Sequence, residues 1–184
     1  MTKKECFIIN GSGGVGKDTF VSFVNKATQS LYSCQTINFS SVDKIKKIAR
    51  IIGWNGGKTE KDRKFLSDLK ILTTNYNDMP FNSMQNKVDE FYHSYGDTND
   101  YNVFLFLHIR EPKEIKRAAE SFNAKTVLVK RDSVKHITSN IADKGVFDYK
   151  YDVIINNNGN LTELEEKAIA FTTDYFNSHL KQEY

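Results

Sequence analysis

The stretch C-F-I-I-N-G-S-G-G-V-G-K-D-T, from Cys6 to Thr19, decides the fold of this 184-residue chain. It opens with an apolar run without alternation, from Cys6 to Ile9, which is typical of a strand buried on both faces of a parallel sheet. Glycines follow, and apolar residues then recur at helical spacing, at Phe20, Phe23, Val24, Ala27 and Leu31. The sequence therefore predicts a buried strand that a glycine-rich turn joins to an amphipathic helix.

The glycine-rich turn matches the first seven positions of the phosphate-binding pattern G-x-x-x-x-G-K-[ST]. The matching residues are Gly11, Ser12, Gly13, Gly14, Val15, Gly16 and Lys17. Such glycines let successive backbone N–H groups point at a phosphate, and the positive end of the following helix adds its partial charge. The pattern predicts ATP as the ligand, with Lys17 reaching its β and γ phosphates.

The eighth position departs from this pattern, because Asp18 stands where Ser or Thr is usual. A carboxylate so close to a phosphate has to point away from it or be bridged by a cation, so Asp18 is a candidate Mg²⁺ ligand. Thr19 follows directly and is a further candidate contact to the phosphates. The alternative is a glycine-rich turn that binds nothing, but strand, glycines, lysine and helix all coincide here.

The rest of the chain alternates short apolar runs with amphipathic stretches. Further strands are predicted over 36–39, 103–109, 126–129 and 151–155, with helices around 45–52, 65–72, 81–95 and 164–175 and one that begins at Pro112. This alternation predicts a single α/β domain over 1–184, with a five-stranded parallel sheet flanked by helices on both faces. Such sheets bind ligands at the carboxyl ends of their strands, where the first loop lies.

Two segments interrupt the alternation. Residues 42–98, approximately, form a long helical insertion between the second and third strands. Residues 131–150, approximately, are polar and weakly periodic, which favours a lid. Arg131 is the first residue of this lid and is a candidate catalytic cation. A lid that closes over the donor excludes water, so that ATP is not simply hydrolysed. A solvent-facing polar loop is the competing interpretation.

Composition argues against several other kinds of protein. The net charge is only +3 and the lysines are scattered, so no nucleic-acid partner is expected. The first apolar run is far too short for a signal peptide or a membrane span, so we expect a cytoplasmic protein without a membrane partner. Cys6 and Cys34 lack metal-ligand spacing and are expected to be reduced, buried thiols. Monomer and homodimer both remain open.

With the run from Gly16 to Thr19 in place, the chain resembles P-loop kinases of the deoxynucleoside monophosphate kinase and phosphomevalonate kinase type, which often read S-G-K-D. The stretch D-K-I-K from Asp43 resembles their D-P-L-K, and Y-D-V-I-I-N-N-N-G from Tyr151 resembles their last strand and turn. The resemblance implies a P-loop kinase fold, ATP with Mg²⁺ as donor, and a small phosphorylated acceptor bound under the helical insertion.

The resemblance also points to the cations of the site. Arg110 matches the strand-end arginine of these kinases, and it directly follows a buried strand on the ligand-binding edge. Its planar guanidinium can bind phosphate with two parallel hydrogen bonds, so it is a candidate for both catalysis and acceptor binding. Lys46, at the end of D-K-I-K, is a further candidate contact to the acceptor. Lys58 and Arg63 lie in the insertion and could clamp the acceptor phosphate.

The acidic residues leave two questions open. Asp43 is a candidate base or water-mediated magnesium contact if the acceptor is a hydroxyl, and a helix cap otherwise. His108 stands where these kinases commonly place an acidic residue, two positions before the arginine. The ligands of magnesium would then be Asp18, Glu111, or phosphate oxygens and water alone.

Three functions are compatible with these observations. The leading one is ATP-dependent phosphoryl transfer to a nucleoside or deoxynucleoside monophosphate. The second keeps this donor but transfers to a non-nucleotide metabolite, such as a phosphorylated alcohol. The third is a nucleotide-binding regulatory module without transfer activity, for which His108 is the best support.

Overall fold

A computed structural model of the chain describes residues 4–94, 102–134 and 145–180, and its centre is a five-stranded sheet. The strands are β1 (Lys4–Asn10), β2 (Cys34–Ser40), β3 (Asn102–His108), β4 (Lys125–Lys130) and β5 (Val153–Asn156). They lie in the order β2-β3-β1-β4-β5, and all the neighbouring pairs are parallel. The predicted α/β class, strand number and strand direction are therefore confirmed.

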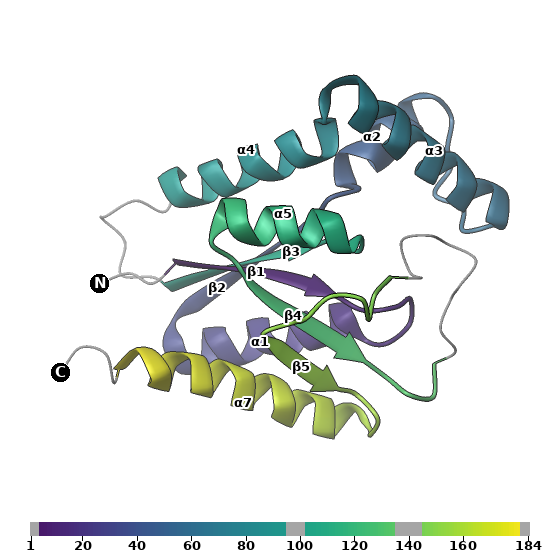
Figure 1. The fold of residues 1–184 in the computed structure, drawn as a ribbon. Coiled ribbons are helices and arrows are strands. Elements are labelled where there is room, and N and C mark those ends of the chain that lie inside the picture. Colours follow the sequence, from purple (N-terminus) through teal and green to yellow (C-terminus); the bar gives the residue numbers. More distant parts are fainter. Residues whose placement is uncertain (1–3, 95–101, 135–144, 181–184) are drawn as a thin grey trace.

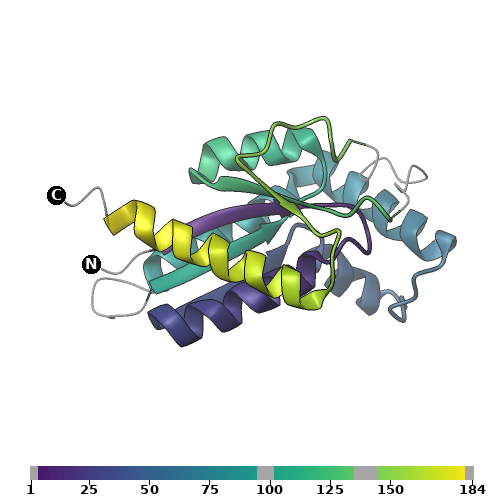
Figure 2. The ribbon, with the colours of Figure 1, turned by 90° about the horizontal axis from the view of Figure 1, so that it is seen from below.

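Helices cover both faces of this sheet (Figures 1 and 2). α1 (Lys17–Tyr32) and α7 (Leu161–Leu180) lie on one face, and α4 (Met79–Ser94) and α5 (Pro112–Phe122) lie on the other. Phe7 and Ile9 of β1 pack toward α1 and α7, whereas Cys6 and Ile8 pack toward α4 and α5. β1 reads as an unbroken apolar run because both of its faces are buried.

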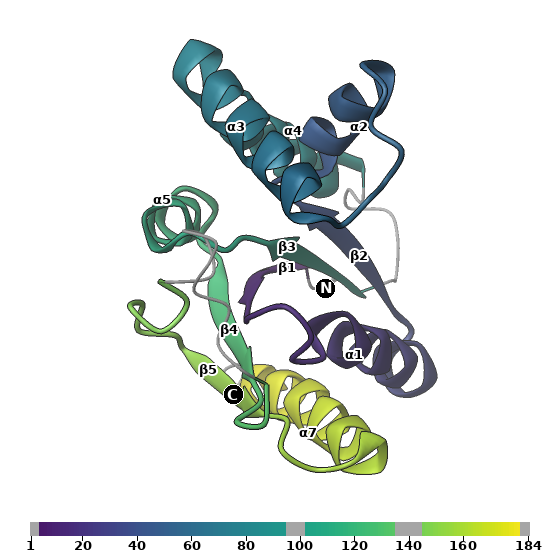
Figure 3. The same ribbon diagram turned by 90° about the vertical axis from the view of Figure 1, so that its right-hand side faces the viewer.

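Between β2 and β3, the described residues 41–94 form three helices, of which two lie beyond the strand ends and one lies along the sheet. α2 (Asp43–Ile51) and α3 (Glu60–Asn77) lie toward the carboxyl ends of the strands, whereas α4 runs along the sheet (Figures 1 and 3). Met84, Val88 and Phe91 of α4 belong to the core, but the buried residue of α3 is a lysine, Lys70. Within 42–94, then, α2 and α3 are the parts that overhang the strand ends, while residues 95–98 of the expected insertion lie outside the described part.

The predicted lid is described only at its two ends. Residues 131–134 follow β4 and residues 145–150 form turns before β5. Residues 135–144 lie outside the described residues, so closure of the segment stays a prediction.

Both cysteines are buried and free of disulfide bonds, as expected. Burial raises the pKa of Cys6 to about 12, and it raises the pKa of Cys34 to about 12 as well. Neither thiol therefore ionises near neutral pH. None of the helices in the described ranges is long and apolar enough to span a membrane.

The strand register sets up the site. Ile9 of β1 pairs with His108 of β3, and His108 pairs in turn with Ser40 of β2. Because these strands are parallel and end level with one another, the residues that follow each of them meet at one edge of the sheet. The glycine loop follows β1, Asp43 follows β2 and Arg110 follows β3.

Candidate phosphate-binding site

The loop between β1 and α1 adopts a backbone that requires glycine at defined positions. Gly11, Gly14 and Gly16 have φ values of +147°, +84° and +93°. A Cβ atom on Gly11 would collide with the carbonyl oxygen of Val129, and one on Gly16 would lie 2.5 Å from Asn157 Nδ2. Gly16 precedes α1 and provides no side-chain cap, so the positive end of this helix is left to another ligand.

The Lys17 side chain folds back onto this loop. Its ammonium group donates hydrogen bonds to the carbonyl oxygens of Gly11 and Ser12, the latter at 3.1 Å. The positive charge of Lys17 is therefore held beside the loop.

Asn10 supports the loop from below, and the sequence analysis did not single it out. Its side chain is fully buried; its Oδ1 accepts from the Gly11 N–H at 2.7 Å, and its Nδ2 donates to the Arg110 carbonyl oxygen at 3.1 Å and to the Tyr151 hydroxyl at 2.6 Å. The Tyr151 hydroxyl donates onward to the Val146 carbonyl oxygen at 2.8 Å. One buried amide thus fixes the phosphate loop relative to the backbone of Arg110. An asparagine at the end of the apolar run was the available signal.

Asn157 supports the loop from the other side. Its buried Nδ2 donates to the Val15 carbonyl oxygen at 2.8 Å, and its backbone N–H donates to the Lys130 carbonyl oxygen at 2.7 Å. In the sequence, Asn157 was noted only as one member of the stretch from Tyr151 that resembles the last strand and turn of P-loop kinases. In the structure, Asn157 holds the turn after β5 against the phosphate loop.

Two cavities flank the loop. The larger cavity has a volume of about 650 Å³ and borders Gly13, Gly14 and the ends of β2 and β3. The smaller cavity has a volume of about 330 Å³ and borders Ser12, Val15 and the residues that follow β4. The loop therefore separates two spaces that a ligand could occupy together.

Most of the charged residues predicted for the site meet at the larger cavity. Its lining includes the cations Lys17, Lys46, Lys58, Arg63, Lys70 and Arg110 and the carboxylates of Asp18, Asp43 and Glu111. These residues come from five separate parts of the chain. Lys58 and Arg63 of the insertion border the same cavity as Arg110, and the clamping of an acceptor phosphate by these two residues stays a prediction.

Two of the predicted residues lie elsewhere. Arg131 borders the smaller cavity, where Nε donates to Ser133 Oγ at 3.2 Å and Nη2 donates to the Gly159 carbonyl oxygen at 3.5 Å. Thr19 is half-buried in the first turn of α1 and borders neither of the two cavities. Catalysis by Arg131 and phosphate binding by Thr19 therefore remain predictions.

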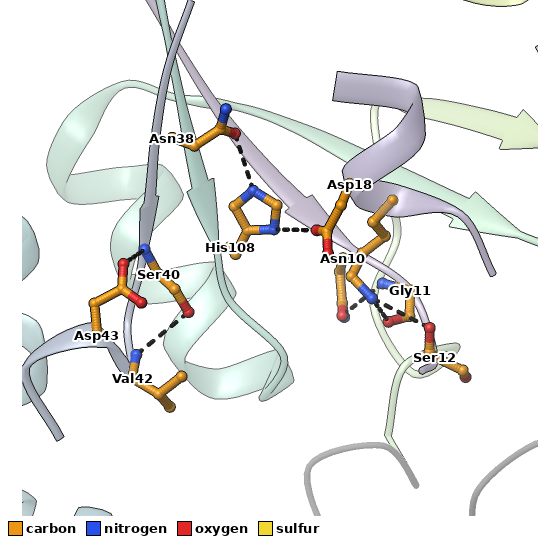
Figure 4. A network of polar contacts seen from close by, with 10 residues as sticks. Asn10, Gly11, Ser12, Asp18, Asn38, Ser40, Val42, Asp43 and His108 are labelled. Atoms are coloured by element: carbon orange, nitrogen blue, oxygen red, sulfur yellow. Dashed lines mark hydrogen bonds and ion pairs between the residues drawn. The ribbon is translucent and has the colours of Figure 1, made fainter. Parts of the chain in front are cut away.

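Asp43 lies at the end of β2, as Figure 4 shows. It is the first residue of α2, and its Oδ2 accepts from the Ser40 N–H at 2.8 Å. The carboxylate thus stabilises the turn after β2 while it borders the larger cavity. The predicted helix cap is therefore wrong, because the N-cap of α2 is Val42 and the Asp43 carboxylate accepts from a residue before the helix and not from its first turn. A role as base or as water-mediated magnesium contact stays a prediction.

His108 and Asp18 lie opposite each other at the entrance of α1 (Figure 4). Nδ1 of His108 is 3.8 Å from Oδ1 of Asp18, and Nε2 is 3.1 Å from Oδ1 of Asn38. Burial lowers the pKa of His108, and the nearby Asp18 carboxylate partly opposes this. The Asp18 side chain is 95% exposed, so its oxygens are open to an ion or to solvent.

This arrangement fits the expected Mg²⁺ when the ion is shared with a nucleotide. Asp18 offers an oxygen ligand at the position that the pattern reserves for a hydroxyl. Among the described residues there is no group of three or more His, Cys, Asp and Glu side chains that could hold a metal. The remaining ligands would therefore be phosphate oxygens and water, as is common for Mg²⁺.

A partly buried ion cluster, which was not predicted, joins α3 to the start of α5. Lys70 Nζ lies 2.7 Å from Glu111 Oε1 and 2.8 Å from Glu114 Oε2, and its side chain is only 11% exposed. Because Glu111 is bound in this cluster, it is a poor substitute ligand for magnesium. The signal was a lysine four residues after Leu66, on the apolar side of its helix.

The two carboxylates of the cluster differ in acidity. Burial opposes the ionisation of Glu111, but the charge of Lys70 and hydrogen bonds to the carboxylate together hold its pKa below the usual value. Burial and the negative charge of Glu111 raise the pKa of Glu114 to about 7. The start of α5 therefore carries one carboxylate with a lowered pKa, at the N-cap residue Glu111, and one that titrates near neutrality, at Glu114 in the first turn.

We expect Glu114→Gln to flatten the pH dependence of stability. The pKa of Glu114 is about 7 in the folded chain against an ordinary 4.5, so between these values the folded state holds the proton more tightly and its stability falls as the pH rises. Above this window the variant should be more stable than the wild type by roughly 1–3 kcal/mol. Urea unfolding across the window measures the difference between the two proteins.

The control for this measurement is Glu120→Gln, on the same helix. The Glu120 side chain is 68% exposed, so its removal should leave the shape of the stability profile unchanged. If Glu114→Gln and the wild type gave parallel profiles, the raised pKa would be contradicted.

Comparisons with known proteins find distant similarity of structure only. No family model and no curated protein sequence matches the chain. Shikimate kinase from Aquifex aeolicus has a TM-score of 0.47 and 12% identity, over 92% of this chain and 97% of its own. APS kinase from Mycobacterium tuberculosis, in complex with AMPPNP and APS, has a TM-score of 0.44 and 10% identity, over 92% and 98%. A sugar kinase from a Janibacter species, unliganded, has a TM-score of 0.39 and 12% identity, over 92% and 94%.

Proposed function

We propose that this chain is an ATP-dependent kinase whose acceptor is a small phosphorylated metabolite, foremost a nucleoside or deoxynucleoside monophosphate. One observation supports this above the others: besides Lys70, which is paired with two carboxylates, five cationic side chains and the glycine loop line a single cavity of about 650 Å³. Phosphoryl transfer mainly requires that two anions be held in line and that positive charge surround the moving group. A cavity that collects cations from separate elements beside a phosphate loop suits this task.

The two cavities suit the two parts of the reaction. The smaller cavity has apolar walls from Val15, Val129 and Phe147 and polar groups from Ser12 and Arg131, which suits a planar base with polar edges. The donor would place its base there and pass its phosphates along the loop toward Lys17. The larger cavity would then hold the transferred group and the acceptor.

The larger cavity offers an acceptor two kinds of contact. Phe39 and Leu66 provide apolar surface, while Lys46 and Arg110 provide positive charge. A nucleoside monophosphate combines a flat, mostly apolar base with a phosphate and would use both kinds. The volume of the cavity lies within the range of about 300–1,000 Å³ that small-molecule sites occupy.

The other two functions each have one supporting feature. Asp43 borders the larger cavity and could accept the proton of a hydroxyl acceptor, which a kinase for a non-nucleotide alcohol would need. His108 replaces the expected acidic residue, which favours a module that binds nucleotide without transfer. Neither feature accounts for the collection of cations.

An acceptor screen tests the proposed function. ADP production from ATP is measured with nucleoside and deoxynucleoside monophosphates, with phosphorylated alcohols and without acceptor, and ATP binding is measured in parallel by calorimetry. We expect turnover that depends on one or more of the monophosphates. Turnover with a phosphorylated alcohol alone would favour the second function, and ATP binding without turnover on any acceptor would favour the third.

A further inference from the structure

The facing pair of Asp18 and His108 differs from the usual ligands of a nucleotide's metal ion. In many P-loop proteins the ion is held by a Ser or Thr hydroxyl from the loop and a carboxylate from a nearby strand. Here the carboxylate is on the loop side, at Asp18, and an imidazole ends the strand, at His108. The candidate protein ligands are therefore one oxygen and one nitrogen.

The geometry allows both side chains to reach one ion. Two donor atoms that each lie about 2.1 Å from a metal are separated by at most about 4.2 Å. Nδ1 of His108 and Oδ1 of Asp18 are 3.8 Å apart (Figure 4). Both residues border the larger cavity, as do Gly13 and Gly14. The pair therefore lies where the phosphates of a nucleotide on the loop would supply the remaining ligands.

A second contact orients the imidazole for this role. The Nε2 of His108 is 3.1 Å from the Asn38 side-chain oxygen, which can only accept a hydrogen bond, so Nε2 carries the hydrogen. In the neutral imidazole Nδ1 then has a lone pair, and it is the nitrogen that faces Asp18. Histidine ligands of metals are commonly fixed in this way, by a hydrogen bond from the opposite ring nitrogen.

The chemistry of this pair favours a particular class of ion. Carboxylate and phosphate oxygens suit Mg²⁺ and Mn²⁺ alike, but an imidazole nitrogen suits transition metals and adds little for Mg²⁺. We propose that Asp18 and His108 together bind the cation of the donor nucleotide and select Mn²⁺ over Mg²⁺. This proposal rests on the proposed function, since the nucleotide supplies the other ligands.

Electron paramagnetic resonance of Mn²⁺ tests the proposal on the full chain with ADP, which lacks the γ phosphate that the proposed reaction transfers. The protein is prepared with ordinary histidine and with ¹⁵N-labelled histidine. We expect a nitrogen coupling to Mn²⁺ that changes with the label and disappears in His108→Gln. In that variant the affinity for Mn²⁺ in the presence of ADP should fall about tenfold, while the affinity for Mg²⁺ stays nearly constant.

Two further variants sharpen this result. His108→Asp replaces the nitrogen with an oxygen ligand and should shift the preference back toward Mg²⁺. His93→Gln is the matched control, because His93 lies on the exposed side of α4 and contacts the Asp89 carbonyl oxygen; it should leave Mn²⁺ binding and the coupling unchanged.

The outcomes separate this proposal from the proposed function. ADP that binds with Mn²⁺ but shows no histidine coupling in the wild type would overturn the metal proposal alone. An equal loss of Mn²⁺ and Mg²⁺ affinity in His108→Gln would also overturn it, because the imidazole would then be merely structural. If calorimetry detected no ADP binding with either ion, both proposals would fall.

Discussion

Replacing Lys17 with Ala is expected to lower turnover by about a thousandfold or more, which is the usual loss when a cation or donor that stabilises a phosphoryl or acyl transition state is removed. The ammonium group lies against the loop, where it donates to the Gly11 and Ser12 carbonyl oxygens. It can transfer from these carbonyls to the phosphates of a bound nucleotide. No other loop residue carries a positive charge, so none can take its place.

The fold should survive this change. Lys17 is the first residue of α1 and is only half-buried, and alanine is the residue most compatible with a helix. Two quantities are measured for the variant and for the wild type: turnover at saturating ATP and acceptor, and the midpoint of thermal unfolding. Lys26→Ala is the control, because Lys26 is on the same helix and pairs with Glu165 at the surface; turnover should not change. Activity of Lys17→Ala within about twofold of the wild type would refute the phosphate-binding role.

The parts of the fold that could be predicted are those that local sequence determines. The run from Cys6 to Ile9 is apolar at every position because each of its side chains meets a helix layer, and the structure places alternate residues in two different core clusters. The glycine loop is equally local, since its φ values depend on glycine at fixed positions. Pro112 begins α5, as predicted.

The start of β5 shows where local patterns become insufficient. The strand was expected from Tyr151, but it begins at Val153. Tyr151 uses its hydroxyl to bond Val146 and Asn10, and the Asp152 carboxylate accepts from the N–H and hydroxyl of Thr126. Tyr151 and Asp152 are therefore held by side-chain hydrogen bonds, and the backbone pairing of β5 with β4 begins only after them. An aromatic residue that resembles strand sequence is here a buried hydrogen-bond donor.

The site was predicted as a set of residue types, but its supports were not. Cations after strand ends and in the insertion were identifiable from charge and position. Asn10 contacts Arg110, Asn157 contacts Val15 and Lys70 contacts Glu114, which lie 100, 142 and 44 residues away along the chain. Periodicity also could not distinguish α3 from α4: both have apolar stripes, but α4 covers the sheet, whereas α3 buries Lys70. Such assignments depend on which surfaces meet in the folded chain.

Arg110→Ala should lower turnover by roughly a hundredfold to a thousandfold with little loss of stability, because the guanidinium would meet charge that develops on the transferred group. The Arg110 backbone is fixed by Asn10 at 3.1 Å, so its position should not depend on the side chain. Arg110→Lys should recover only part of the activity, since an ammonium cannot form two parallel hydrogen bonds.

Arg117→Ala is the control and should behave in the opposite way. Arg117 pairs with Asp78 at 2.6 Å and lies 3.6 Å above the Phe81 ring, so its loss should lower the unfolding midpoint and leave turnover unchanged. If Arg110→Ala lowered stability and retained activity, Arg110 would be structural and the transition-state cation would have to be sought among Lys46, Lys58 and Arg63.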